Sequence, residues 1–166
     1  MTVGQVLGYL LSVLGARLLG PETFSELGTL LGLLVIGGVV PLAMQTVAAR
    51  RVAAQDEGAS PDELLRLSLL AGTAVSVVGL LLTPVIVTVL QLDLLPTAFV
   101  AVSLLPLTAA GAALGLAQGR ELFTRLAGQY AVLAVARVGL AVVVLVATRS
   151  VTATMLAELV GAAVGW

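Results

Sequence analysis

Arg137 lies fifteen residues into an apolar stretch that runs from residue 122 to residue 147. An arginine at the centre of a bilayer costs between about 2.5 and more than 10 kcal/mol, so such residues usually face a partner or a water-filled cavity. Its guanidinium presents a planar fork of donors that suits the oxygens of a diphosphate. Glu158 is the one acid in the following apolar stretch. Arg137 is therefore either a substrate-binding residue or the ion-pair partner of Glu158.

Other polar residues and prolines inside the apolar stretches are weaker candidates for the same site. Arg17 ends the first stretch, where snorkelling to the outer headgroups accounts for it and a cavity role is the alternative. Gln45 and Gln118 could contact a polar substrate, although hydrogen bonding between helices is the commoner use of such amides. Pro84 and Pro106 lie well inside their stretches and are candidates for packing kinks or for hinges.

The chemistry that the sequence lacks narrows the function further. The chain has no cysteine and no histidine, which removes disulfides, zinc sites built on those residues, thiol nucleophiles and Ser-His-Asp triads. The ionisable residues inside the apolar stretches are isolated, whereas a catalytic constellation needs clustered acid, base or metal groups. We therefore expect no enzymatic activity, no catalytic residues, no metal and no cofactor. The chain has no long basic run, so we expect no nucleic-acid partner.

The apolar stretches themselves predict the fold. They cover residues 3–19, 28–49, 64–90, 97–117 and 122–147, and a sixth occupies residues 151–166. About 17–25 apolar residues are needed for a helix to cross the hydrocarbon core, in which the backbone must satisfy its own hydrogen bonds. Hydrophobic residues make up 60% of the chain and charged residues 10%. The sequence predicts a single all-α domain over residues 1–166, a polytopic transmembrane bundle of five complete helices and a truncated sixth, embedded in the lipid bilayer.

The distribution of arginine predicts the orientation, because cytoplasmic loops of membrane proteins are enriched in basic residues. The loop after the second stretch and the loop after the fourth hold five arginines, and the alternate loops hold only Arg149. These five are Arg50, Arg51, Arg66, Arg120 and Arg125. We therefore expect the N-terminus to lie in the cytoplasm.

Capping signals and small residues predict the helix ends and the helix packing. Residues 60–63 (SPDE) form a capping box with proline at the first helical position, and residues 23–26 (TFSE) have the same form before the second helix. Pro96 is expected to separate the third helix from the fourth. Small residues recur four apart in most stretches, as in Gly111, Gly115 and Gly119, a spacing that lets helix backbones approach closely in lipid.

Three segments resemble a known family of membrane transporters. Residues 16–24 (ARLLGPETF), 45–53 (QTVAARRVA) and 115–123 (GLAQGRELF) are similar to segments of the bacterial polysaccharide biosynthesis flippases. That family belongs to the multidrug/oligosaccharidyl-lipid/polysaccharide exporter superfamily, abbreviated MOP. Ser25 departs from the pattern, since the family usually has glycine after the phenylalanine.

The resemblance implies one lobe of a two-lobe exporter, a fragment whose missing second lobe or second copy would complete a central cavity. It implies a transporter of the bacterial cytoplasmic membrane that moves a polyprenyl-diphosphate-linked oligosaccharide to the outer leaflet during polysaccharide biosynthesis. Arg137, Arg17, Gln45 and Gln118 would then be its candidate substrate-binding residues. A multidrug or small-solute exporter of the same superfamily and a noncatalytic membrane scaffold subunit are the alternatives.

Overall fold

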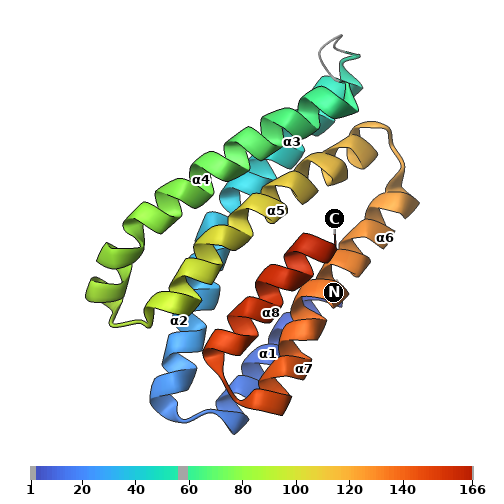
Figure 1. Cartoon of the computed structure of the whole chain (residues 1–166). Helices are drawn as coiled ribbons and strands as arrows, with labels where there is room; N and C mark the ends of the chain where they lie inside the picture. The colour runs from blue at the N-terminus through green and yellow to red at the C-terminus, as the bar shows by residue number, and fades with distance from the viewer. Residues whose placement is uncertain (1–2, 56–59, 166) are drawn as a thin grey trace.

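The computed structural model describes residues 3–55 and 60–165, and within these ranges the regular secondary structure is entirely helical (Figure 1). The elements, in chain order, are α1 (Val3–Leu18), α2 (Pro21–Gly37), α3 (Val39–Ala53), α4 (Pro61–Leu90), α5 (Leu94–Gly119), α6 (Phe123–Ala134), the π-helix η1 (Val135–Gly139), α7 (Leu140–Thr148) and α8 (Val151–Val164).

Four helical segments of the described chain are long and apolar enough to cross a membrane. They are Pro21–Ala53, which joins α2 and α3, then Pro61–Leu90, Leu94–Gly119, and Phe123–Thr148, which joins α6, η1 and α7. Helices α1 and α8 are shorter, with 16 and 14 residues. The predicted all-α multi-pass membrane bundle is confirmed.

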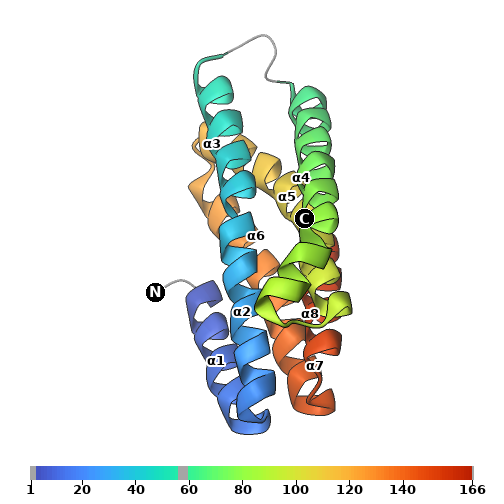
Figure 2. The same ribbon diagram turned by 90° about the vertical axis from the view of Figure 1, so that its left-hand side faces the viewer.

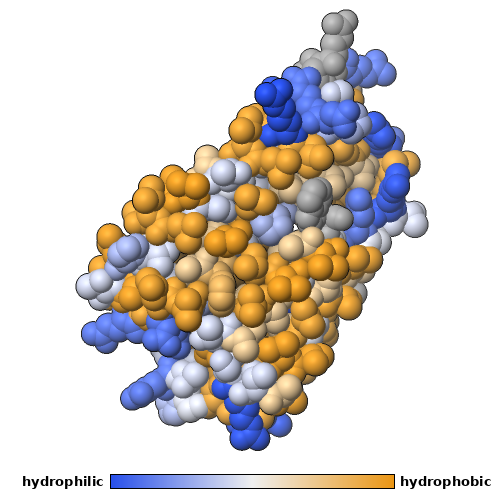
Figure 3. Space-filling model, in the orientation of Figure 1, coloured by the Kyte–Doolittle hydropathy of each residue, from blue (hydrophilic) through white to orange (hydrophobic). Residues whose placement is uncertain are grey.

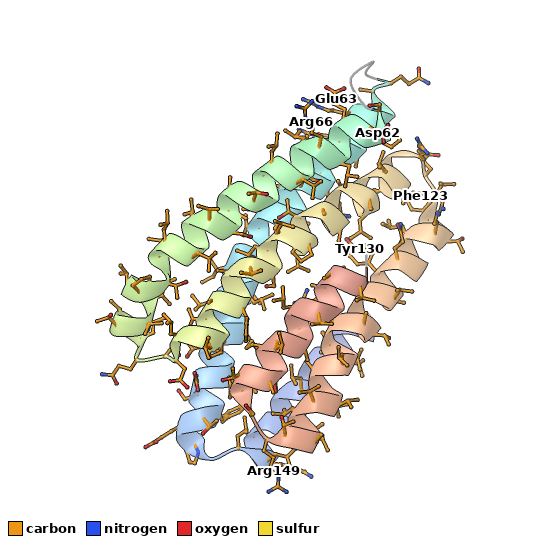
Figure 4. The ribbon with its side chains drawn as sticks, in the orientation of Figure 1. Asp62, Glu63, Arg66, Phe123, Tyr130 and Arg149 are labelled. Carbon is orange, nitrogen blue, oxygen red and sulfur yellow. The ribbon has the colours of Figure 1, made fainter. Side chains whose placement is uncertain are left out.

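The surface has an apolar belt between two polar ends (Figure 3). Large apolar side chains such as Leu81, Val89 and Val143 are exposed, as expected where lipid is the solvent. Figure 4 places Arg66 and Phe123 at one end of the bundle and Arg149 at the other. The two arginine-rich loops therefore share one end of the molecule, as the orientation argument requires.

Helix α5 forms the centre of the bundle, with α3, α4 and α8 packed around it (Figures 1 and 2). In its most apolar window 72% of the residues are buried, against 11% in the windows of Pro61–Leu90 and Phe123–Thr148. Its buried residues include many that are small, such as Ala109, Ala112 and Gly115. A helix this rich in small residues can be enclosed closely on several sides.

The glycines of α5 meet the backbone of α3 directly. A Cβ on Gly111 or Gly115 would collide with the carbonyl oxygen of Pro41 or Gln45, and one on Gly119 would lie 2.7 Å from that of Ala49. The predicted small-residue packing therefore occurs between α3 and α5. The equivalent pair in α2, Gly28 and Gly32, has no atom within 4 Å of a built Cβ.

Two of the predicted helix boundaries are wrong and one is confirmed. The second helix begins at Pro21, not after a box at residues 23–26, because proline at the first helical position fits a helix start directly after Gly20. Helix α5 begins at Leu94, so Pro96 lies in its first turn, and the break falls at Gln91 with its left-handed backbone. The predicted Ser60 cap is present, with its hydroxyl accepting from the Glu63 N–H at 3.2 Å.

The span predicted over residues 28–49 is not one regular helix. It is divided at Gly38, between α2 and α3. Pro41 has no N–H with which to continue the helical hydrogen bonding across that point. The Gly38 N–H still donates to the Leu34 carbonyl at 2.9 Å, so the two helices continue as one span.

Candidate functional site

An open cavity of about 510 Å³ lies between α1, α2, α3, α5, α8 and the segment from α6 to η1. Most of its wall is apolar, with Leu11, Leu34 and Leu107 among the lining residues. Four residues of the wall carry polar side chains: Gln45 of α3, Tyr130 of α6, Arg137 of η1 and Glu158 of α8. An apolar cavity with a few convergent polar groups is the usual form of a ligand site.

Arg137 and Glu158 form an ion pair at this wall. The Arg137 Nε donates to Glu158 Oε2 at 2.6 Å, with side-chain exposures of 23% and 2%. A guanidinium has five N–H donors, and this bond uses one of them. Among the described residues, no other hydrogen bond of Arg137 is present. The pair therefore neutralises a buried carboxylate while the terminal nitrogens of Arg137 stay available to the cavity.

The π-helix η1 holds Arg137 at its centre, and α8 packs directly against it. Gly161 makes this contact possible, because a Cβ there would lie 2.6 Å from the Cα of Arg137 and would collide with the carbonyl oxygen of Ala136. Glu158 precedes Gly161 by three residues, so both lie on one face of α8. Single π turns inside α-helices often occur at functional sites. The close approach at Gly161 thus places the Glu158 carboxylate within reach of Arg137.

Gln45 joins three helices on another side of the cavity. Its Nε2 donates to Gln118 Oε1 at 2.9 Å, and its Oε1 accepts from the Tyr130 hydroxyl at 2.8 Å. Gln45 is buried, whereas Gln118 and Tyr130 are exposed. The predicted alternative for the two glutamines, hydrogen bonding between helices, is therefore present in the structure.

Sequence reasoning missed Tyr130 as a member of the site. The available signal was its position seven residues before Arg137, two helical turns along the same stretch. Tyr130 alone does not form an aromatic belt, so composition gave no reason to select it.

The remaining candidates do not line this cavity. Arg17 is exposed in the last turn of α1, and it does not line the cavity. Pro84 is exposed on α4, Pro106 is buried in α5, and both helices continue past them. The described residues contain no group of three or more acids, histidines or cysteines that could hold a metal ion.

Three solved structures have the same arrangement of helices. A MOP-superfamily transporter from Pyrococcus furiosus, for which a binding pocket of reversed polarity suggests a different function, superposes with a TM-score of 0.77 at 16% identity over 97% of this chain. The chain has the fold of one lobe of a MATE-like transporter. It spans 39% of the length of that protein.

Two further solved structures also superpose on this chain. A MATE transporter crystallised as a complex gives a TM-score of 0.69 at 16% identity, over 98% of this chain and 40% of its own. An inward-facing multidrug resistance MATE family transporter of the MOP superfamily gives a TM-score of 0.68 at 17% identity, over 99% of this chain and 41% of its own. No family model matches the sequence, and no curated protein matches it either.

Proposed function

We propose that the chain is one lobe of a transporter that moves a polyprenyl-diphosphate-linked oligosaccharide to the outer leaflet of the bacterial cytoplasmic membrane. A second lobe or a second copy of the chain would close the other side of the translocation path. The single observation that carries this proposal is Arg137, a cation inside a membrane bundle that faces a cavity with most of its donors unused.

The diphosphate is the part of such a substrate that most needs help in crossing the bilayer. Its oxygens accept paired hydrogen bonds from a guanidinium, and hydrogen bonds between ionised groups are roughly twice as strong as those between neutral groups. The Glu158 carboxylate keeps Arg137 paired when no substrate is bound. An arriving diphosphate would meet the terminal nitrogens of the guanidinium without first breaking the Nε bond.

The other candidate residues would act beside the Arg137 cavity and at the far end of the translocation path. Gln118 and Tyr130 are exposed beside Gln45 and offer an amide and a phenol to sugar hydroxyls. Arg17 lies at the opposite end of the bundle, where it could meet the anionic headgroup on release. Pro84 and Pro106 stay candidates for the bends that alternating access requires.

The test replaces Arg137 in the full-length parent protein and measures glycan export per folded molecule in the membrane. Arg137→Lys keeps the charge and loses the fork, so we expect much of the export to be lost, and Arg137→Ala should lose nearly all. Arg149→Ala removes an arginine outside the cavity and serves as the control. Normal export per folded molecule in Arg137→Ala would refute the substrate-binding role.

The same variants separate binding from a purely structural role. If Arg137 only neutralises Glu158, Arg137→Ala should lower the amount of folded protein by leaving a buried carboxylate unpaired, at a cost of about 3–5 kcal/mol. The double change with Glu158→Gln should then restore both abundance and export. Such a rescue would show that Arg137 has a structural role only.

A multidrug or small-solute exporter is the second candidate function. The apolar wall of the cavity favours it, as does the similarity to a multidrug resistance MATE transporter. In that case deletion of the parent protein should raise the cellular accumulation of lipophilic cations or anions and leave surface glycan unchanged. The flippase proposal expects the reverse pattern.

A further inference from the structure

A second crevice, of about 400 Å³, lies between α5, α6 and the end of α8. It has a largely apolar floor, to which Ala110 and Leu114 of α5 contribute. Arg125 and Gln129 of α6 supply its polar groups. None of the residues of α6 from Phe123 to Ala134 is fully buried, so the rest of the bundle covers α6 only in part.

The two polar side chains of the crevice have no partner among the described residues. Arg125 is exposed and makes neither a hydrogen bond nor an ion pair there. The Gln129 amide makes no hydrogen bond, and its Oε1 is buried. A buried polar atom without a partner calls for a physical explanation, of which a missing ligand is one.

The lining residues of α6 follow a chemical order along one face of the helix. Arg125, Gln129 and Leu133 are spaced four residues apart, about 6 Å per step, from the arginine-rich end of the bundle towards its middle. A phospholipid has the same order along the bilayer normal, with phosphate outermost, then the ester groups, then the acyl chains. A guanidinium suits the phosphate, and an amide N–H suits an ester carbonyl.

We propose that this crevice binds an anionic phospholipid of the cytoplasmic leaflet, with its phosphate on Arg125, its ester region at Gln129 and one acyl chain against Leu114 and Leu133. The inference does not depend on the proposed transport function, because Arg125 and Gln129 do not line the Arg137 cavity, although Leu114 and Leu133 lie in the walls of both. Acyl chains gain little on leaving other lipid tails, so selectivity comes from the headgroup. We expect preference for phosphatidylglycerol over phosphatidylcholine, by about five-fold for one well-placed arginine.

The experiment measures lipid that stays bound to the purified full chain after detergent exchange, by native mass spectrometry, with phosphatidylglycerol and phosphatidylcholine supplied in equal amounts. Arg125→Gln should abolish the preference, and Ala113→Phe, which fills the crevice, should lower retention of both lipids. Arg50→Gln removes an exposed arginine at the same end of the bundle and should change neither the headgroup preference nor the retention of lipid. Unaltered helical circular dichroism identifies variants that remain folded.

Three results would overturn the proposal. Equal losses of the phosphatidylglycerol preference in Arg125→Gln and Arg50→Gln would indicate general attraction of anionic lipid to a basic surface. Displacement of the lipid by millimolar inorganic phosphate would indicate a site for free anions. Unchanged retention in a folded Ala113→Phe variant would show that the acyl chain lies elsewhere. None of these outcomes depends on whether the chain exports glycan.

Discussion

Substitution of Gly161 by alanine tests the contact that positions Glu158 against Arg137. The added Cβ would lie 2.6 Å from the Cα of Arg137 and collide with the Ala136 carbonyl oxygen, and neither atom can rotate away because both belong to the backbone. Overpacking of this kind costs about 1–3 kcal/mol. Alanine recovers about 1 kcal/mol of helix propensity. With the steric cost at the top of its range, we expect the free energy of unfolding to fall by about 2 kcal/mol.

Gly28→Ala is the matched control. Gly28 lies inside α2 with no atom within 4 Å of a built Cβ, so it should gain about 1 kcal/mol of helix propensity without a steric cost. The two substitutions are chemically identical and should differ by about 3 kcal/mol in the free energy of unfolding. Equilibrium unfolding of the purified chain in mixed micelles, followed by circular dichroism, measures that difference.

The same variant also tests the link to the ion pair. To admit the new methyl group, α8 must move away from η1, and Glu158 must move with it. The coupling free energy between Arg137 and Glu158, measured by a double-mutant cycle, should therefore fall in the Gly161→Ala background. Equal stability changes for Gly161→Ala and Gly28→Ala, or an unchanged coupling energy, would refute the reasoning.

Two further predictions concern orientation and the Gln45 network. A cysteine at Ser60 should resist a membrane-impermeant thiol reagent in intact cells while one at Asp93 should react, and the absence of native cysteine leaves no background; reversed labelling would overturn the arginine argument. Tyr130→Phe removes the hydroxyl that Gln45 accepts from and should cost about 1 kcal/mol in the same unfolding assay, whereas Tyr9→Phe, at a residue that is 74% exposed, should cost almost nothing.

The sequence was sufficient to predict the fold class because membrane helices leave a strong signal. Each span needs a long run of apolar residues, and most of the charged residues lie in or beside the loops, so the order of the helices follows from hydropathy. Local chemistry predicted the Ser60 cap correctly, since a hydroxyl three residues before a backbone N–H is a short-range feature. The prediction from Thr23 was wrong because a second start signal, Pro21, lies two residues earlier, and the helix begins at that proline.

The features that shape the candidate site depend on contacts between distant segments. Gly161 is one of many glycines in the sequence, and only its position against η1 shows that a side chain there would collide with another backbone. The π-helix around Arg137 has no local sequence signature, and the break at Gly38 became evident only from the backbone. The sequence was sufficient to identify both partners of the Arg137–Glu158 pair. Charged residues inside apolar stretches are rare, and they usually pair with one another.

The geometry of that pair bears on how a transporter lobe could keep a cation inside the bilayer without making it unavailable. A bidentate pair would satisfy two donors of the guanidinium and hold its planar face against the carboxylate. Here the bond through Nε offsets the cost of burying Glu158, which is 2% exposed. The terminal nitrogens of Arg137, whose side chain is 23% exposed, make no hydrogen bond among the described residues. A ligand can then bind and leave without creating an unpaired buried charge, the event that would cost several kcal/mol at each cycle. Under the proposed function, this arrangement lets the site bind an anion reversibly inside the membrane.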